Sequence, residues 1–329
     1  MLTVIFGVIS GCSKNTDSEK QPKFVAVSGG GWLGGVEYSD KAAYSINGID
    51  WSYSKMPSVS WWESVCYGNG KFVAIDQGRH AKSNKAAYST DGIKWEKATL
   101  PVEKMWDSVC YGNGKFVAVT DSIAAYSTDG IKWKATALPD ETSLSNVCYG
   151  NGKFIAIGNS KTVAYSEDGI IWSMAALPVE AAWSGICYGN GKFVAVASSD
   201  DYHDEENSSN AIYSVDGIKW FAATMPYETR WGSVCYGNKR FVAISCGHNI
   251  ADGTKHNDKA AYSDDGIKWK ATKLPSTAFW GNICYGNGKF VAVAAPSSSE
   301  AAYSTDGIKW IRTTLPNEAS WSSVCYSGE

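Results

Sequence analysis

The sequence has little that points to a nucleic-acid partner. Only four of its 329 residues are arginine, and 30 lysine and arginine side chains stand against 33 carboxylates, so the formal net charge is −3. Nucleic-acid binding depends on a clustered basic surface that neutralises phosphates. We therefore expect no nucleic acid among the partners of this chain.

The sequence also lacks a hydrophobic run long enough to cross a bilayer as a helix, which takes about 20 residues. The apolar stretch over residues 1–11, MLTVIFGVISG, is shorter and ends next to Cys12. Such a stretch is typical of the hydrophobic part of a secretion signal. Residues 9–12, ISGC, resemble the bacterial lipobox, whose cysteine becomes the lipid-modified first residue of the mature protein.

This resemblance implies a signal peptide over residues 1–11 and a lipidated Cys12. The protein is then an exported lipoprotein, anchored to a membrane at the bacterial cell surface or in the periplasm. Residues 13–22 are polar and have no periodicity, so residues 12–22 are expected to form a disordered tether that starts at the lipid. The alternative is that the first residues form a buried or frayed N-terminal strand.

A sustained helical period is missing as well, whereas three short phrases recur in a fixed order. KFVAV, YSTDGIKW and SVCY, or close variants of them, each occur seven times. The first KFVAV begins at Lys23, the first phrase of the YSTDGIKW type begins at Tyr44, and the first SVCY ends at Tyr67. The repeat length of about 44 residues is typical of propeller blades.

Each repeat is predicted to contain four short antiparallel strands. SVCY precedes a Gly-Asn-Gly turn, and Asn-Gly is a strong hairpin signal because both turn positions favour positive φ. KFVAV, AAYS and the segment after the TDGI turn supply the other three strands. Such units repeated around an axis leave no long exposed sheet edge. We predict an all-β fold, a seven-bladed β-propeller of four-stranded blades over residues 23–329, with a linear β-solenoid as the alternative.

The two ends of the repeat region complement each other. The first unit has KFVAV from Lys23 but no SVCY before it, whereas the last unit supplies SVCY at 323–326 with no KFVAV after it. Together they complete one blade. We therefore predict that pairing of the C-terminal strand with the N-terminal strands closes the ring.

The phrase YSTDGIKW resembles the Asp-box of the BNR-repeat, sialidase-like propellers. In the second unit the pattern is matched by Ser89, Asp91, Gly92 and Trp95, with a spacing one residue shorter. The resemblance covers all seven units and implies a structural turn, in which the aspartate caps backbone N–H groups. The aspartates with this structural role are Asp91, Asp129, Asp168, Asp216, Asp265 and Asp306.

Sialidase activity is not expected despite this resemblance. Sialidases need several arginines that converge on the substrate carboxylate, and this chain has four in all. No residue is singled out as catalytic. Another glycoside hydrolase, which needs two carboxylates about 5–9 Å apart, stays open as an alternative. The repeats are also similar to photosystem assembly propellers, so an assembly scaffold is a further alternative.

The two faces of a propeller built from these units should differ. One face carries the Gly-Asn-Gly and Asp-box turns and is rich in lysine, and we expect the lipid tether to hold it towards an anionic membrane. The other carries the loops that vary between units, such as residues 28–41, 197–210 and 245–259. Binding sites usually lie on the variable loops of a rigid scaffold.

Two rings of side chains are predicted on this variable face. The tryptophans before the inner strands are Trp62, Trp106, Trp183, Trp231, Trp280 and Trp321, and the carboxylates that follow the Leu-Pro or Met-Pro links are Glu103, Glu141, Glu180, Glu228 and Glu318. Indoles beside carboxylates suit sugars, which stack on aromatic rings and bond through hydroxyls. The alternative is that the repeated tryptophans wedge between blades, which leaves Trp32 and Trp61 as ligand contacts.

Cofactors and metals are not expected. His203, Cys246, His248 and His256 fall in variable loops and are the candidates for zinc or another transition metal, but their spacing matches no known zinc finger. Seven of the nine cysteines occupy one repeated strand position, which favours packing between blades over disulfides. We therefore predict a monomeric, non-catalytic binding module for glycans or a protein partner.

Overall fold

The computed structural model describes residues 23–29, 38–78, 81–139, 143–199, 207–247, 257–295 and 297–328. Over these residues the regular structure consists of 24 β-strands and no helix. Several predictions lie outside the described residues and stay predictions. They concern the signal peptide, Cys12 and the tether, and also Trp32, Glu141, His203, His248 and His256.

Two four-stranded sheets show the repeated unit in its simplest form. One contains, in order, β4 (Trp62–Gly68), β5 (Lys71–Asp76), β6 (Ser83–Ser89) and β7 (Glu96–Lys104). The other contains β8 (Ser108–Gly112), β9 (Lys115–Val119), β10 (Ile123–Ser127) and β11 (Lys134–Ala137). Neighbours in each sheet are consecutive in the chain and antiparallel, as the order of the phrases predicts.

Two larger sheets arise because some strands run on from one unit into the next. The six-stranded sheet contains β12 (Leu144–Gly150), β13 (Lys153–Ser166), β14 (Ser173–Gly189), β15 (Lys192–Ser199), β16 (Ser208–Ser214) and β17 (Phe221–Thr229). The ten-stranded sheet contains β18 (Trp231–Gly237), β19 (Arg240–Ser245), β20 (Asn257–Ser263), β21 (Lys270–Gly286), β22 (Lys289–Ala295), β23 (Ser298–Ser304), β24 (Ile311–Tyr326), β1 (Phe24–Gly29), β2 (Ser39–Ser45) and β3 (Ser52–Ser60). The long strand β14, for example, pairs with β13 over its first residues and with β15 over its last.

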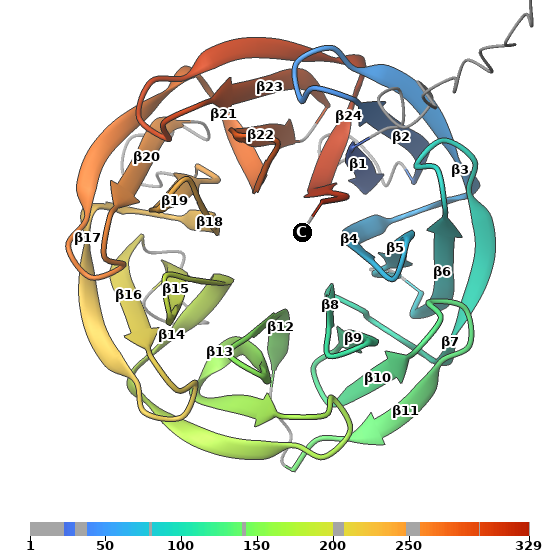
Figure 1. Ribbon diagram of the computed structural model, residues 1–329, viewed down its shortest axis with the longest axis horizontal. Coiled ribbons are helices and arrows are strands. Elements are labelled where there is room, and N and C mark those ends of the chain that lie inside the picture. The colour runs from blue at the N-terminus through green and yellow to red at the C-terminus, as the bar shows by residue number, and fades with distance from the viewer. Residues whose placement is uncertain are drawn as a thin grey trace, which may run out of the picture.

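The sheets form a closed ring around a central axis. Figure 1 shows β4, β8, β12 and β18 close to the axis, and β7, β11 and β17 at the rim. Successive strands of a unit therefore step outwards from the axis. This is the arrangement of a β-propeller.

Strands from opposite ends of the chain close the ring. β1 pairs antiparallel with β24, with Phe24 opposite Tyr326 and Val27 opposite Ser323. The N–H of Ser327 donates to the carbonyl of Lys23 at 2.7 Å, which extends the ladder by one bond. The predicted pairing of the C-terminal strand with the N-terminal strands is confirmed.

The hairpin turns of neighbouring units interlock on one face. Asn69 has a φ of 45° and Gly70 a φ of 73°, the left-handed values that the Asn-Gly signal predicts. The Asn69 side-chain amide donates to the carbonyl of Thr128, in the Thr-Asp-Gly turn of the next unit, at 3.3 Å. We call the surface that carries both kinds of turn the turn face, and the opposite surface the variable-loop face.

The hydrophobic core lies between neighbouring units, not within one of them. One cluster combines Val73 and Ala86 of the second unit with Trp106 and Phe116 of the third. All four side chains are buried. Each unit thus completes its core only against its neighbours, which is the energetic reason for the ring.

Candidate ligand-binding site

The aspartates of the repeated Asp-Gly turns bond to their own turns. Asp91 Oδ1 accepts the N–H groups of Ile93 and Lys94, both at 2.8 Å, and the hydroxyl of Ser89 at 3.0 Å. Burial alone raises the pKa of Asp91, but the N–H groups of Lys94 and Ile93 outweigh it and leave the pKa below its usual value. Oδ1 of this carboxylate is thus occupied by the turn itself.

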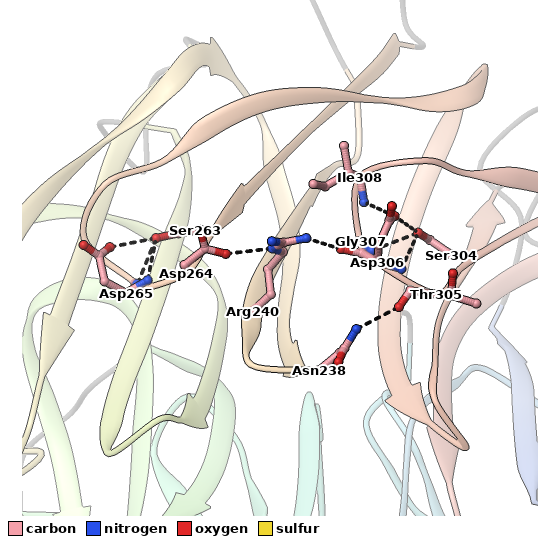
Figure 2. A network of polar contacts seen from close by, with 11 residues as sticks. Asn238, Arg240, Ser263, Asp264, Asp265, Ser304, Thr305, Asp306, Gly307 and Ile308 are labelled. Carbon is pink, nitrogen blue, oxygen red and sulfur yellow. Dashed lines mark hydrogen bonds and ion pairs between the residues drawn. The ribbon is translucent and has the colours of Figure 1, made fainter.

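Arg240, a basic side chain of the turn face, contacts the turns themselves. Arg240 Nε lies 2.9 Å from Asp264 Oδ1, and Arg240 Nη1 donates to the carbonyl of Asp306 at 2.6 Å (Figure 2). Asn238 donates to the carbonyl of Thr305 at 3.0 Å in the same contact. These groups join two neighbouring units, so this part of the turn face is devoted to structure.

A polar cavity opens where the inner strands begin, near the variable-loop end of the axis. Its volume is about 360 Å³, and we call it the axial cavity. Its lining comes mainly from the one or two residues that follow each inner-strand tryptophan or Leu144, among them Glu63, Asp107, Asn146 and Asn282. The ends of second strands add Gln77 and Asn159. The cavity therefore offers carboxylates, amides and hydroxyls.

A β-bulge turns the first of these residues out of the sheet. In β4, Trp62 is opposite Asp76 and Ser64 is opposite Ile75, so Glu63 has no residue opposite it. The same shift occurs in β18 between Trp231 and Ser233. Bulges commonly redirect a side chain at functional sites. Here the bulge places Glu63 in the lining of the axial cavity.

Two carboxylates from neighbouring units line one side of the axial cavity. Glu63 Oε2 accepts the indole N–H of Trp61 at 2.7 Å, and Asp107 Oδ1 accepts the amide N–H of Gln77 at 2.7 Å. Gly232 and Gly281, from two other units, line the same cavity without a side chain. The lining is thus charged where Glu63 and Asp107 stand and open where the glycines stand.

Hydroxyl groups hold the lining rigid. Ser323 Oγ accepts the N–H of Val65 at 3.2 Å, and Ser64 Oγ accepts the N–H of Val109 at 3.2 Å. Each bond joins one inner strand to the next around the axis. The polar groups of the axial cavity are therefore preorganised by bonds between units, which lowers the entropy cost of binding.

The predicted rim of exposed indoles is corrected by the structure. Trp62, Trp106, Trp183, Trp231, Trp280 and Trp321 are at most 1% exposed. Where the indole N–H is bonded, it donates to the carbonyl four residues earlier, as Trp62 does to Ser58 at 3.1 Å. Trp61 is 5% exposed, and its indole N–H donates to Glu63 Oε2. The repeated indoles pack between units, as the alternative interpretation has it, because their area is needed to complete the core. Trp61, which that interpretation left as an exposed ligand contact, is buried as well.

The predicted glutamate ring does not converge on the axial cavity. Glu103, Glu180, Glu228 and Glu318 are exposed, and none of them lines that cavity. The carboxylates that do line it, Glu63 and Asp107, were missed from the sequence. A signal was present, because the position after the repeated tryptophan holds serine or glycine in most units and an acid in these two.

A metal site is not formed by the described part of the chain. Within it, no three His, Cys, Asp or Glu side chains come close enough together to bind an ion. Burial raises the pKa of Cys246 to about 11, and burial likewise raises the pKa of the inner-strand Cys66. All eight described cysteines are free thiols, and those with raised pKa values are poor nucleophiles at neutral pH. The described ranges also contain no helix of the length and apolar character that crossing a bilayer takes.

Comparison with known proteins supports the fold. No family model and no curated protein sequence matches the chain. Among solved structures, YCF48 from Cyanidioschyzon merolae is similar, with a TM-score of 0.55, 12% identity, and coverage of 78% of this chain and 85% of that one. The computationally designed Ika8 protein is similar with a TM-score of 0.56, 8% identity, and coverage of 91% and 89%. At these identities the likeness shows a β-propeller fold alone.

Proposed function

We propose that the chain is a non-catalytic binding module that takes a polar ligand, first of all a glycan, on its variable-loop face. The observation that carries the proposal is the axial cavity, whose preorganised hydroxyls, amides and carboxylates suit the hydroxyl groups of a sugar. A protein partner that inserts a polar side chain is the other form of the same proposal. A β-propeller is compatible with either, because it holds variable loops on a rigid ring.

The ring is proposed to have seven blades of Asp-box type. The strand inventory supports this count, because β13, β14, β21 and β24 each span two positions of the four-strand unit. With these four strands counted twice, the 24 strands fill seven sets of four. The seven copies of each sequence phrase agree with that count.

A glycan array probed with the full chain tests the proposal. Selective binding to one group of glycans is the expected result, and binding to none removes the glycan form of the proposal. A partner screen by cross-linking in the native envelope then tests the protein form, which also covers the assembly-scaffold alternative.

A glycoside hydrolase is the second candidate, because Glu63 and Asp107 line the same cavity. Two carboxylates on opposite sides of a glycosidic bond are the minimum that such an enzyme requires. Release of reducing sugar from polysaccharides, abolished in Glu63→Gln, would establish this alternative. Absence of release from every glycan that binds on the array supports the non-catalytic form.

The lipid anchor is proposed to attach the turn face to a membrane. Lys23 leads into β1 at the turn-face end, where its carbonyl accepts the N–H of Ser327, and this position supports an attachment on that face. Basic residues on this face favour an anionic lipid surface. Membrane fractionation of the full chain and of Cys12→Ala tests the anchor, and release of only the variant into the soluble fraction is the expected result.

A further inference from the structure

A second, smaller cavity lies away from the axis, between the first two units. Its volume is about 240 Å³, and we call it the peripheral pocket. Tyr38, Val59 at the end of β3, Lys82, Lys85 and Glu103 contribute to its lining. Asp76 lines this pocket whereas the next residue, Gln77, lines the axial cavity. The two cavities therefore flank the end of one strand, β5.

The peripheral pocket combines exposed apolar surface with charged and amide groups. Tyr38 is 39% exposed and Val59 is 56% exposed, so both present apolar surface to a ligand. The lysines Lys82 and Lys85 and the exposed carboxylate of Glu103 supply hydrogen-bond donors and an acceptor around them. An exposed ring beside such groups is the combination that the axial cavity lacks.

A network around Asp76 fixes the floor of the pocket. Asp76 is 2% exposed, and its Oδ1 accepts the N–H groups of Trp61 at 2.9 Å and of Gly78 at 3.1 Å. The Ser60 hydroxyl donates to Asp76 Oδ2 at 3.0 Å and accepts from Lys85 Nζ at 2.9 Å. The carboxylate is thus saturated, and one of the two pocket lysines is held in place.

The chain beside this network is also tightly constrained. Gly78 has a φ of 62°, and a Cβ placed there would lie 2.5 Å from the backbone nitrogen of Ser83, so only glycine fits. Lys82 has a φ of 26°, an uncommon value for a residue with a side chain. Strained backbone of this kind persists where the surrounding structure holds it, often at ligand clamps. The pocket is therefore built in advance of any ligand.

We propose that the peripheral pocket binds one hexopyranose ring, stacked on Tyr38 through its C–H face and bonded through its hydroxyls to Lys82, Lys85 and Glu103. This inference rests on the proposed glycan function and assigns it a second site. Two lysines against Glu103 and the saturated Asp76 leave no strong excess of either sign, which suits a neutral sugar. At about 240 Å³ the pocket is smaller than the roughly 300 Å³ from which drug-sized sites begin, which favours a single ring over a longer chain.

Saturation-transfer difference NMR on the full chain tests the inference. The probes are the methyl glycosides of glucose, galactose, mannose and N-acetylglucosamine. Saturation of ring C–H protons by the protein is the expected result for at least one of them. Tyr38→Ala should weaken that binding by about fivefold, the scale of an aromatic stacking contact, while Tyr38→Phe retains it. Tyr53→Ala is the matched control, since Tyr53 is 45% exposed and does not line the pocket.

Three outcomes overturn the inference. Binding by Tyr38→Ala that is as strong as that of the parent places the sugar elsewhere and leaves the proposed glycan function intact. Equal weakening by Tyr38→Ala and Tyr53→Ala points to a loss of folding. Lys82→Ala then decides: the inference fails if this variant, with a melting curve like that of the parent, binds as the parent does. No transfer to any of the four glycosides removes the pocket as a hexopyranose site, whereas the glycan array still decides the proposed function.

Discussion

The ring of Tyr111 occupies the place where a side chain on Gly68 would stand. A Cβ built on Gly68 would lie 2.0 Å from Cγ of Tyr111, although the two residues belong to inner strands of neighbouring units. The same relationship joins Gly112 to Tyr149 and Gly286 to Tyr326. The repeated Tyr-Gly pair is thus a contact between units, in which each tyrosine packs on the glycine of the preceding inner strand.

Gly112→Ala should therefore destabilise the ring. The added methyl group has to displace the Tyr149 ring, and overpacking of this kind costs about 1–3 kcal/mol. Gly281→Ala is the matched control, because the closest atom to its Cβ, the Trp321 carbonyl oxygen, is 3.3 Å away. Urea unfolding followed by tryptophan fluorescence gives both free energies. Equal values for the two variants would contradict the contact.

The buried tryptophans allow a paired test of their hydrogen bonds. Trp62 Nε1 donates to the Ser58 carbonyl at 3.1 Å, whereas Trp183 Nε1 is buried with no partner among the described residues. Trp62→Phe loses a bond and should cost about 1 kcal/mol more than Trp183→Phe, which removes an unpaired donor. Thermal and urea unfolding measure the difference. A larger cost for Trp183→Phe would show that its indole N–H is paired in solution.

The carboxylates of the repeated Asp-Gly turns should make stability depend on acid pH. Burial alone raises the pKa of Asp129, but the N–H groups of Lys132 and Ile131 outweigh it, so the net pKa is lowered on folding. The stability that the charge contributes is therefore full above the unfolded pKa of about 3.9 and is lost as the pH falls through the lower folded pKa. Asn47 already fills the equivalent position in the first unit with the same backbone bonds.

Asp129→Asn consequently isolates the charge. We expect the variant to be less stable than the parent at pH 6, with the difference shrinking towards pH 3. Urea unfolding across this range is the measurement. A difference that does not change with pH would mean that the charge contributes nothing and that the acceptor oxygen alone matters.

Deleting residues 321–329 should open the ring. The deletion removes the residues of β24 that pair with β1 from Phe24 to Ser28, and it exposes the core on both sides of the gap. The expected result is loss of a single cooperative unfolding transition in calorimetry. A deletion of residues 1–21, which removes none of the described strands, is the control and should leave the transition unchanged. An unchanged transition in the first deletion would contradict closure by this pairing.

Repetition in the sequence explains how much of the fold could be predicted. The Asn-Gly signals placed turns such as Asn69–Gly70, and the unmatched phrases at the two ends predicted that the strand at 323–326 pairs with the strand that begins at Lys23. Repetition does not reveal which way a side chain faces. The bulge next to Trp62 buries the indole and turns Glu63 towards the axis. No pattern in the sequence indicates where this bulge lies.

The candidate site was harder to predict because it lies in exceptions to the repeat. Glu63 and Asp107 replace small residues at a single position, whereas the prediction followed the residues that all units share. The peripheral pocket joins Tyr38 of one unit to Lys82 and Glu103 of the next. Such a meeting depends on how neighbouring sheets are placed around the axis, which local patterns do not encode.

The most direct test of the account fills the axial cavity. Gly281 lines it and its φ is not in the left-handed region. The one atom close to its Cβ position is the Trp321 carbonyl oxygen at 3.3 Å, which has to shift by only a few tenths of an ångström, so Gly281→Leu should fold and project into the cavity. Isothermal titration with the strongest ligand from the glycan array should show at least about a tenfold loss of affinity, or about 1.4 kcal/mol. Thr305→Leu, on the turn face, should bind as the parent does. Full affinity in Gly281→Leu, or equal losses in both variants, would contradict binding at the axial cavity.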